Sequence, residues 1–248
     1  MKTYYKIILG GVFLTAVACS QKQFDQTMKS AGEILNTGTS SGALSNGDVV
    51  SGLKEALTIG AKNSSGLASK LDGFYKNPEI FIPFPPAAIK VKNVAMDLGL
   101  GSQITKFETT LNRAAEEAAK EAAPIFISAI TSMSISDGFA ILKGGKTAAT
   151  DYLKSKTTAA LKTSFQPKVK NAIAKVELTK YYTPLANAYN TSTMLTGAAT
   201  VNPDLENYVT DKAISGLFTL ISKEETKIRD NPAARVTELL KKVFGSKT

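Results

Sequence analysis

The most informative absence in this chain of 248 residues is histidine, which does not occur at all. Without histidine the protein cannot build a Ser-His-Asp triad, a Cys-His pair, a His-ligated zinc site or the Glu-x-x-His di-iron site of helix bundles. Any acid or base must then be a carboxylate, a lysine or a tyrosine. We therefore expect no metal ion, no other cofactor and no catalytic residue that the sequence alone can assign.

Cysteine occurs only once, and Cys19 lies at the end of a short apolar segment. Residues 1–6 carry two lysines and no acid, residues 7–17 are uncharged, and small residues precede the cysteine. This layout is typical of a cleaved secretory signal. The uncharged stretch is too short to span a bilayer.

The run LTAVAC at residues 14–19 resembles the lipobox of bacterial lipoproteins, although Ala16 occupies the place usually held by leucine. The resemblance implies a signal peptide over residues 1–18 and a palmitate-type lipid anchor on Cys19, which becomes the first residue after cleavage. Because Ser20 rather than aspartate follows, the resemblance also implies the outer membrane, with the protein facing the periplasm. The plainer alternatives are an ordinary signal peptide or a small buried hydrophobic residue.

Acidic residues are scarce in one part of the chain, where residues 143–180 hold nine lysines against Asp151 and Glu177. Such asymmetry indicates a surface that faces an anionic partner. In the cell envelope this partner would be a lipid headgroup, a glycan or an acidic protein, and not nucleic acid. A solvated lysine face that keeps the domain soluble explains the same pattern. The candidate docking residues are Lys154, Lys162, Lys168, Lys170 and Lys175.

Long hydrophobic runs are absent beyond the leader, so we expect a packed core and no membrane span. Residues 19–43 end in a Gly/Ser/Thr-rich run that predicts a flexible tether. From residue 44 onwards, apolar residues recur at helical spacing and no pair of strands is indicated. We therefore predict a single all-α domain with many helices over residues 44–248.

One segment interrupts the helical pattern. Residues 72–86 (DGFYKNPEIFIPFPP) contain four prolines and alternate apolar side chains at Ile80, Ile82 and Phe84. Proline lacks an amide donor and disfavours helix in the preceding residue, so we predict an extended, Pro-rich apolar segment. It either covers the core or forms the rim of a groove.

Prolines and capping residues also predict where helices begin and end. Pro124 is expected to kink or restart a long helix, and Pro167 is expected to separate two helices. Ser136 and Asp137 are expected to cap a short helix over residues 139–142.

Polar residues recur on the long helix that precedes Pro124. Glu108, Asn112 and Glu116 follow one another every four residues and therefore share one face. The simplest interpretation is a solvated charged face. The alternative is a polar cluster of Asn112, Arg113 and Glu116 in a cleft, where carboxylates act as acid and base or the arginine binds an anionic ligand.

Five stretches of the chain resemble a bacterial family known as domain of unknown function 4197. They are residues 44–57, 72–83, 98–118, 133–145 and 205–245, which together cover nearly all of the predicted domain. The resemblance implies an exported or lipid-anchored helical protein, and the family supplies no established activity, cofactor or catalytic residue. The polar residues that we select from these stretches are Asp72, Asn112, Arg113, Glu116, Asp137 and Arg235. A helix cap or a salt bridge is the default role for each of them.

The sequence therefore favours a non-enzymatic, lipid-anchored protein of the cell envelope. Its binding partner would be an anionic lipid, an apolar ligand or an envelope protein. Two alternatives stay open: an envelope hydrolase that uses carboxylates such as Glu116 and Asp137, and a structural or assembly factor of the envelope. A cleft that holds both carboxyl groups within about 5–10 Å would support the hydrolase.

Overall fold

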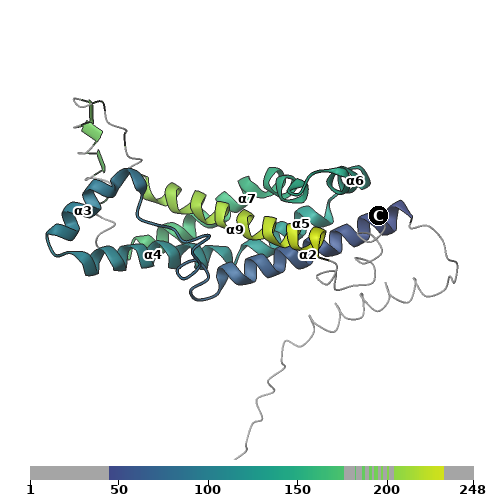
Figure 1. Ribbon diagram of the computed structural model, residues 1–248, viewed down its shortest axis with the longest axis horizontal. Helices are drawn as coiled ribbons and strands as arrows, with labels where there is room; N and C mark the ends of the chain where they lie inside the picture. The colour runs from purple at the N-terminus through teal and green to yellow at the C-terminus, as the bar shows by residue number, and fades with distance from the viewer. Residues whose placement is uncertain are drawn as a thin grey trace, which may run out of the picture. The chain divides into compact units, whose positions relative to one another are not determined.

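The structure, a computed structural model, describes residues 45–175 and 204–231 together with individual residues between 182 and 200. Within these residues it consists of helices and loops and contains no strand, which confirms the predicted all-α class (Figure 1). The predicted signal peptide, Cys19, the tether and Arg235 lie outside the described residues.

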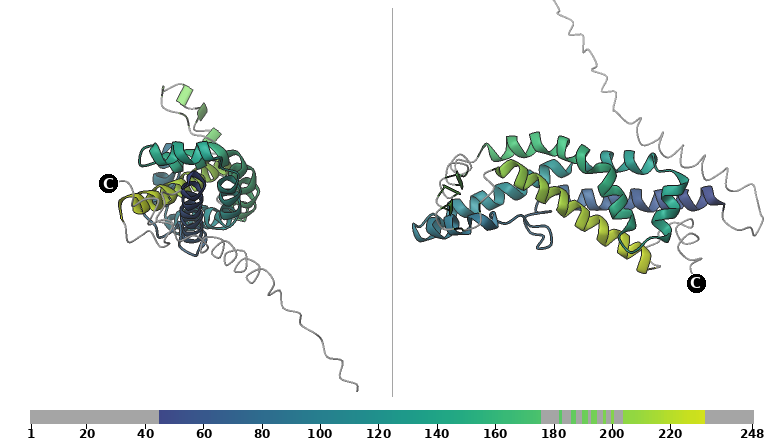
Figure 2. Two further views of the ribbon diagram at one scale, coloured as in Figure 1. Left: turned by 90° about the vertical axis from the view of Figure 1, so that its right-hand side faces the viewer. Right: turned by 90° about the horizontal axis from the view of Figure 1, so that it is seen from above.

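Four long helical segments pack around one hydrophobic core. α7 contacts α4, α5 and α9, and α2 contacts α4, α5, α6 and α9 (Figures 1 and 2). Among the described residues no single helix is long and apolar enough to cross a membrane. Residues 101–131 and α6 are together long and apolar enough for a span, but they meet at a bend of 105°. The bounds of the helices are α2 Asn46–Ser69, the 3-10 turn η1 Pro86–Ala88, α3 Ile89–Asp97, α4 Gly101–Ala119, α5 Ala122–Thr131, α6 Ile135–Lys143, α7 Ala148–Ile173 and α9 Leu205–Asp230.

Small residues let α4 pack closely against its neighbours. Beyond Leu111 this helix buries mostly alanines. The distance between two packed helices decreases with the size of the side chains between them, so α4 can lie close to its neighbours. Larger side chains from α7 fill the space at every fourth position. The buried residues of this α7 stripe are Leu153, Thr157, Leu161, Phe165, Val169 and Ile173.

Capping boxes set the starts of α2 and α6. Ser45 Oγ accepts from Asp48 N at 3.1 Å, while the Asp48 carboxylate accepts from Ser45 N at 3.0 Å. Ser134 and Asp137 form the same reciprocal pair at the start of α6. The helix expected over residues 139–142 thus begins earlier, at Ile135. Asp137 contributes to its cap as predicted, but from the third helical position, whereas the expected cap Ser136 is wrong, because Ser134 is the N-cap.

The two helical prolines behave differently. α4 ends at Ala119 and α5 begins at Ala122, so Pro124 lies in the first turn of α5 and the predicted restart is confirmed. The predicted break at Pro167 is wrong, because α7 runs through it without interruption. Pro167 and the carbonyl of Thr163 lie on the exposed side of the helix. That carbonyl, which loses its amide donor, can therefore bond to water.

Residues 70–85, which we call the strap, join α2 to η1 and differ partly from the extended segment that was predicted. Turns occupy its first half, where Lys76 N donates to Asp72 O and Phe81 N donates to Asn77 O. Burial then alternates as expected, with Ile82 and Phe84 buried and the residue between them partly exposed. This period of two is typical of extended backbone. The strap therefore covers the core.

Candidate functional site

The polar stripe of α4 faces the strap. Ile82 N donates to Asn112 Oδ1 at 2.8 Å, and Asn112 Nδ2 donates to Ile82 O at 2.9 Å. Asn112 is completely buried. This reciprocal pair supplies the two hydrogen bonds that a neighbouring strand would otherwise give to Ile82.

Glu108 and Glu116 extend the same arrangement along the strap. Glu116 Oε1 accepts from the amides of Phe74 and Tyr75, both at 3.1 Å, and Glu108 Oε1 accepts from the amide of Phe84 at 3.2 Å. The interpretation of a solvated face is therefore wrong for Glu116, which is 4% exposed, and for Asn112. We call Glu108, Asn112 and Glu116 the strap clamp.

Arg113 is held between two carboxylates beside the clamp. Its Nη1 lies 2.6 Å from Glu116 Oε2, and its Nη2 lies 2.6 Å from Asp72 Oδ1. Glu116 and Asp72 raise the pKa of Arg113, whereas hydrogen bonds from Lys76 and Arg113 lower the pKa of Asp72. The guanidinium also lies 5.4 Å from the ring centroid of Tyr75. These contacts occupy the arginine within the protein and indicate a structural role.

The structure thus brings Asn112, Arg113 and Glu116 together, but Asp137 has separate partners. Asp137 caps α6, and its hydrogen bonds with Ser134 lower its pKa. Among the hydrogen bonds of the described residues, none joins Asp137 to Glu116. Arg235 lies outside the described residues.

A second buried carboxylate, Glu225, escaped the sequence analysis. It accepts from the amides of Ala149 and Thr150 at 3.0 and 2.8 Å, and it pairs with Arg229 at 2.8 Å. Glu225 therefore satisfies the amino-terminal end of α7, where the helix dipole also favours a negative charge. Its position on the buried apolar stripe of α9, three residues before Ile228, is the signal that predicts its burial.

The five lysines predicted to dock on an anionic surface differ in their surroundings. Lys162 pairs with Asp211 at 3.1 Å and Lys168 pairs with Glu121 at 3.2 Å. The other three, Lys154, Lys170 and Lys175, are exposed and form no ion pair with another described residue. Within the described part of the chain, no carboxylate neutralises these three lysines.

Exposed apolar side chains gather at α3 and its connection to α4, residues 89–100, which we call the tip. Half of the large exposed apolar residues of the described chain lie there. They are Ile89 (41% exposed), Met96 (49%), Leu98 (71%) and Leu100 (38%). Figure 1 shows α3 at the end of the helical unit that lies away from α6. Gly99, with a φ of 77°, allows the chain to turn sharply there.

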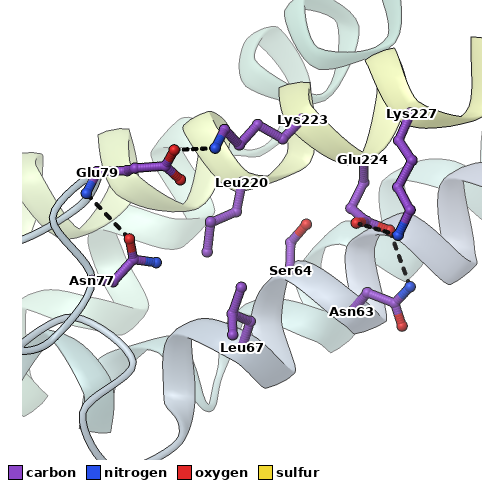
Figure 3. A pocket seen from close by; sticks show the side chains of 9 residues that line it. All are labelled: Asn63, Ser64, Leu67, Asn77, Glu79, Leu220, Lys223, Glu224 and Lys227. Carbon is purple, nitrogen blue, oxygen red and sulfur yellow. Dashed lines mark hydrogen bonds and ion pairs between the residues drawn. The ribbon is translucent and has the colours of Figure 1, made fainter. Parts of the chain in front are cut away.

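A pocket of about 390 Å³ lies between α2, the strap and α9 (Figure 3). Leu67 and Leu220 supply apolar wall. Two ion pairs stand at its rim: Lys223 pairs with Glu79, and Lys227 lies 3.6 Å from Glu224. The sequence left two roles open for the strap, covering the core or forming the rim of a groove. The strap has both, because its apolar side chains cover the core while Asn77 and Glu79 border this pocket.

Two polar groups in this pocket have no partner among the described residues. Ser64 is 1% exposed, and its Oγ forms no hydrogen bond. Asn77 Oδ1 accepts from Glu79 N at 3.1 Å, which leaves its Nδ2 uncommitted. Figure 3 shows Ser64 Oγ and Asn77 Nδ2 both directed into the space between the two helices and the strap.

Comparison with known proteins identifies the family. The chain matches, over residues 43–245, the model of a family described as Protein of unknown function (DUF4197). The chain belongs to this family. No curated protein and no solved structure matches it. Within the described part of this DUF4197 protein, no three His, Cys, Asp or Glu side chains gather in a way that could hold a metal ion.

Proposed function

We propose that this DUF4197 protein is a non-enzymatic binding domain of the bacterial cell envelope. A lipid on Cys19 holds it at the membrane, and the tip docks on the lipid surface. The single observation that carries the docking proposal is the exposure of Met96, Leu98 and Leu100 together in one short segment. Exposed apolar side chains grouped in one segment are typical of a contact with a membrane or a partner.

The charges next to the tip favour an anionic lipid surface as the partner. Lys90 and Lys106 are exposed there, and Asp97 is the acidic residue of the same segment. Near an anionic bilayer each lysine contributes about 1 kcal/mol, and burial of apolar surface adds about 25 cal/mol per Å². The tip therefore combines the two forces that hold a peripheral segment at a membrane.

The predicted tether limits how the helical unit can meet the bilayer. A flexible linker with the length of residues 19–43 has a root-mean-square span of about 25–30 Å. It would join the unit at the start of α2, which packs against α6 through Val50 and lies away from the tip (Figure 1). Because α2 alone is about 36 Å long, the tip would reach the bilayer that holds the anchor when the unit lies along its surface.

The buried carboxylates support a role without catalysis. Glu116 and Glu225 use their oxygens to hold backbone amides and an arginine side chain each. A hydrolase based on Glu116 and Asp137 would need both groups at one substrate, whereas each is engaged with separate partners. An assembly factor would instead bind a protein through the tip.

A depth probe at the tip tests the proposal. Because acylation occupies the sulfur of Cys19, the variant Leu98→Cys would carry the only free thiol, to which an environment-sensitive fluorophore can be attached. Leu71→Cys is the matched control, since Leu71 is 74% exposed but lies on the strap. We expect blue-shifted emission and quenching by nitroxide lipids at position 98 alone. Equal responses at both positions, or none, would contradict docking by the tip.

A further inference from the structure

We infer that the pocket between α2, the strap and α9 binds a small zwitterion with an ammonium group and a carboxylate, namely a free amino acid or a short peptide. This inference concerns a surface separate from the tip and does not depend on membrane docking.

Two hydrogen-bond donors of the pocket can bind acceptor oxygens of a ligand. Among the described residues the Ser64 hydroxyl is buried without a partner, and the Asn77 amide directs an Nδ2 without a partner into the same space (Figure 3). Buried polar groups are nearly always paired, and of the three unpaired hydroxyls of the described residues, Ser64, Ser65 and Thr210, only that of Ser64 lines this pocket. A carboxylate has two acceptor oxygens and can accept from both groups at once.

The charges at the rim favour a ligand with one positive and one negative group. Two ammonium groups and two carboxylates alternate there as the pairs Lys223–Glu79 and Lys227–Glu224. A ligand with a net charge would leave one charge at the rim unbalanced. A zwitterion would instead pair its carboxylate with a rim lysine and its ammonium group with a rim glutamate, so the net charge of the site stays at zero. The pairs can open easily, because all four side chains are at least partly exposed and such ion pairs are weak.

The apolar wall and the volume set the size of the ligand. Leu67 is 40% exposed, whereas Leu220, across from it, is 4% exposed, so an aliphatic side chain of the ligand would pack mainly against Leu67. The volume of about 390 Å³ lies at the lower end of the range for ligand sites, roughly 300–1,000 Å³. This size suits an amino acid or a short peptide.

Titration calorimetry on the full chain in detergent tests the ligand class. The probes are L-leucine and leucyl-leucine, and the blocked analogues are N-acetyl-leucine, which lacks the ammonium group, and leucinamide, which lacks the carboxylate. We expect binding of a zwitterionic probe and roughly tenfold weaker binding of each blocked analogue. Tighter binding of the dipeptide would identify peptides as the source, and tighter binding of leucine would identify the free amino acid.

Two neighbouring serines provide a matched pair of variants. Ser64→Ala removes the hydroxyl that faces the pocket, and Ser65→Ala removes a hydroxyl that is also buried and unpaired but does not line it. We expect roughly 3- to 10-fold weaker binding for Ser64→Ala and no change for Ser65→Ala. Lys227→Gln, at the exposed rim, should also weaken binding. No heat of binding with either probe, equal binding of the blocked analogues, or equal effects of the two serine variants would overturn the inference.

Discussion

Replacement of Asn112 by aspartate tests whether α4 holds the strap through hydrogen bonds. The two side chains have nearly the same shape, and a carboxylate can still accept from Ile82 N. Its second oxygen, however, cannot donate to Ile82 O or Glu108 O, which lie 2.9 and 2.8 Å from Asn112 Nδ2. Asn112→Asp therefore turns two hydrogen bonds into two contacts between oxygens at a completely buried position.

The structure sets the expected magnitude. A buried polar group that loses its partner costs about 1–3 kcal/mol. In Asn112→Ala both the amide and the carbonyl of Ile82 lose a partner, so the free energy of unfolding should fall by about 2–4 kcal/mol. In Asn112→Asp a buried, unpaired charge raises the loss to about 4–6 kcal/mol at neutral pH. Domains of this size have about 5–15 kcal/mol in total, so the aspartate variant should be only marginally stable.

The loss caused by Asn112→Asp should depend on pH. Burial and the two facing carbonyl oxygens raise the pKa of the introduced carboxyl group in the folded state above its unfolded value of about 3.9. Below that value the group is protonated in both states and carries no charge penalty. As the pH rises towards the folded pKa, the unfolded state releases its proton first, and the variant loses stability relative to the wild type.

Urea denaturation followed by circular dichroism between about pH 4 and pH 8 measures these differences. Asn112→Ala is the control, because its difference from the wild type should stay constant with pH. A loss below about 0.5 kcal/mol for Asn112→Ala would refute the strap clamp, since surface substitutions alone produce changes of that size. A loss for Asn112→Asp that does not grow with pH would also refute it.

Three further predictions follow from other contacts. Gly216→Ala should lower stability by about 1–3 kcal/mol, because its Cβ would lie 2.8 Å from a ring carbon of the strap, while Gly66→Ala, which meets open space, should stabilise α2 by about 0.5–1 kcal/mol. Similar melting temperatures for the two variants would contradict this. Glu225→Ala should cost about 2–4 kcal/mol and speed amide hydrogen exchange in the first turn of α7. Unchanged exchange there would count against it. Lys170→Glu combined with Lys175→Glu should reduce retention on anionic vesicles but not on neutral ones, and unchanged retention on both would exclude a docking role for these lysines.

The helices and the strap follow from patterns that act over a few residues. The alternation at Ile80, Ile82 and Phe84 predicts their burial, and the spacing from Ser134 to Asp137 is that of a capping box. Pro124 follows the local rule, because it lies in the first turn of α5, where a missing amide costs no helical hydrogen bond. Pro167 does not break α7, because it lies on the exposed side of the helix. Which side is exposed depends on the neighbouring helices, and local patterns do not show this.

Local patterns do not show whether a polar side chain on a helix faces solvent or binds another segment. A spacing of four residues between Glu108, Asn112 and Glu116 suits a solvated face as well as a clamp. Only the return of the strap along α4 distinguishes the two. The pocket is harder still, since Ser64, Asn77 and Lys223 come from three separate segments whose proximity depends on the complete fold.

Attachment of lipid to Cys19 is the central claim of the proposed function, and metabolic labelling with radioactive palmitate tests it most directly. Cells that produce the chain should incorporate the label into it and retain it in the envelope fraction, while cells that produce Cys19→Ser should show no labelled chain. Absence of label from the native chain, or equal labelling of both chains, would contradict the account.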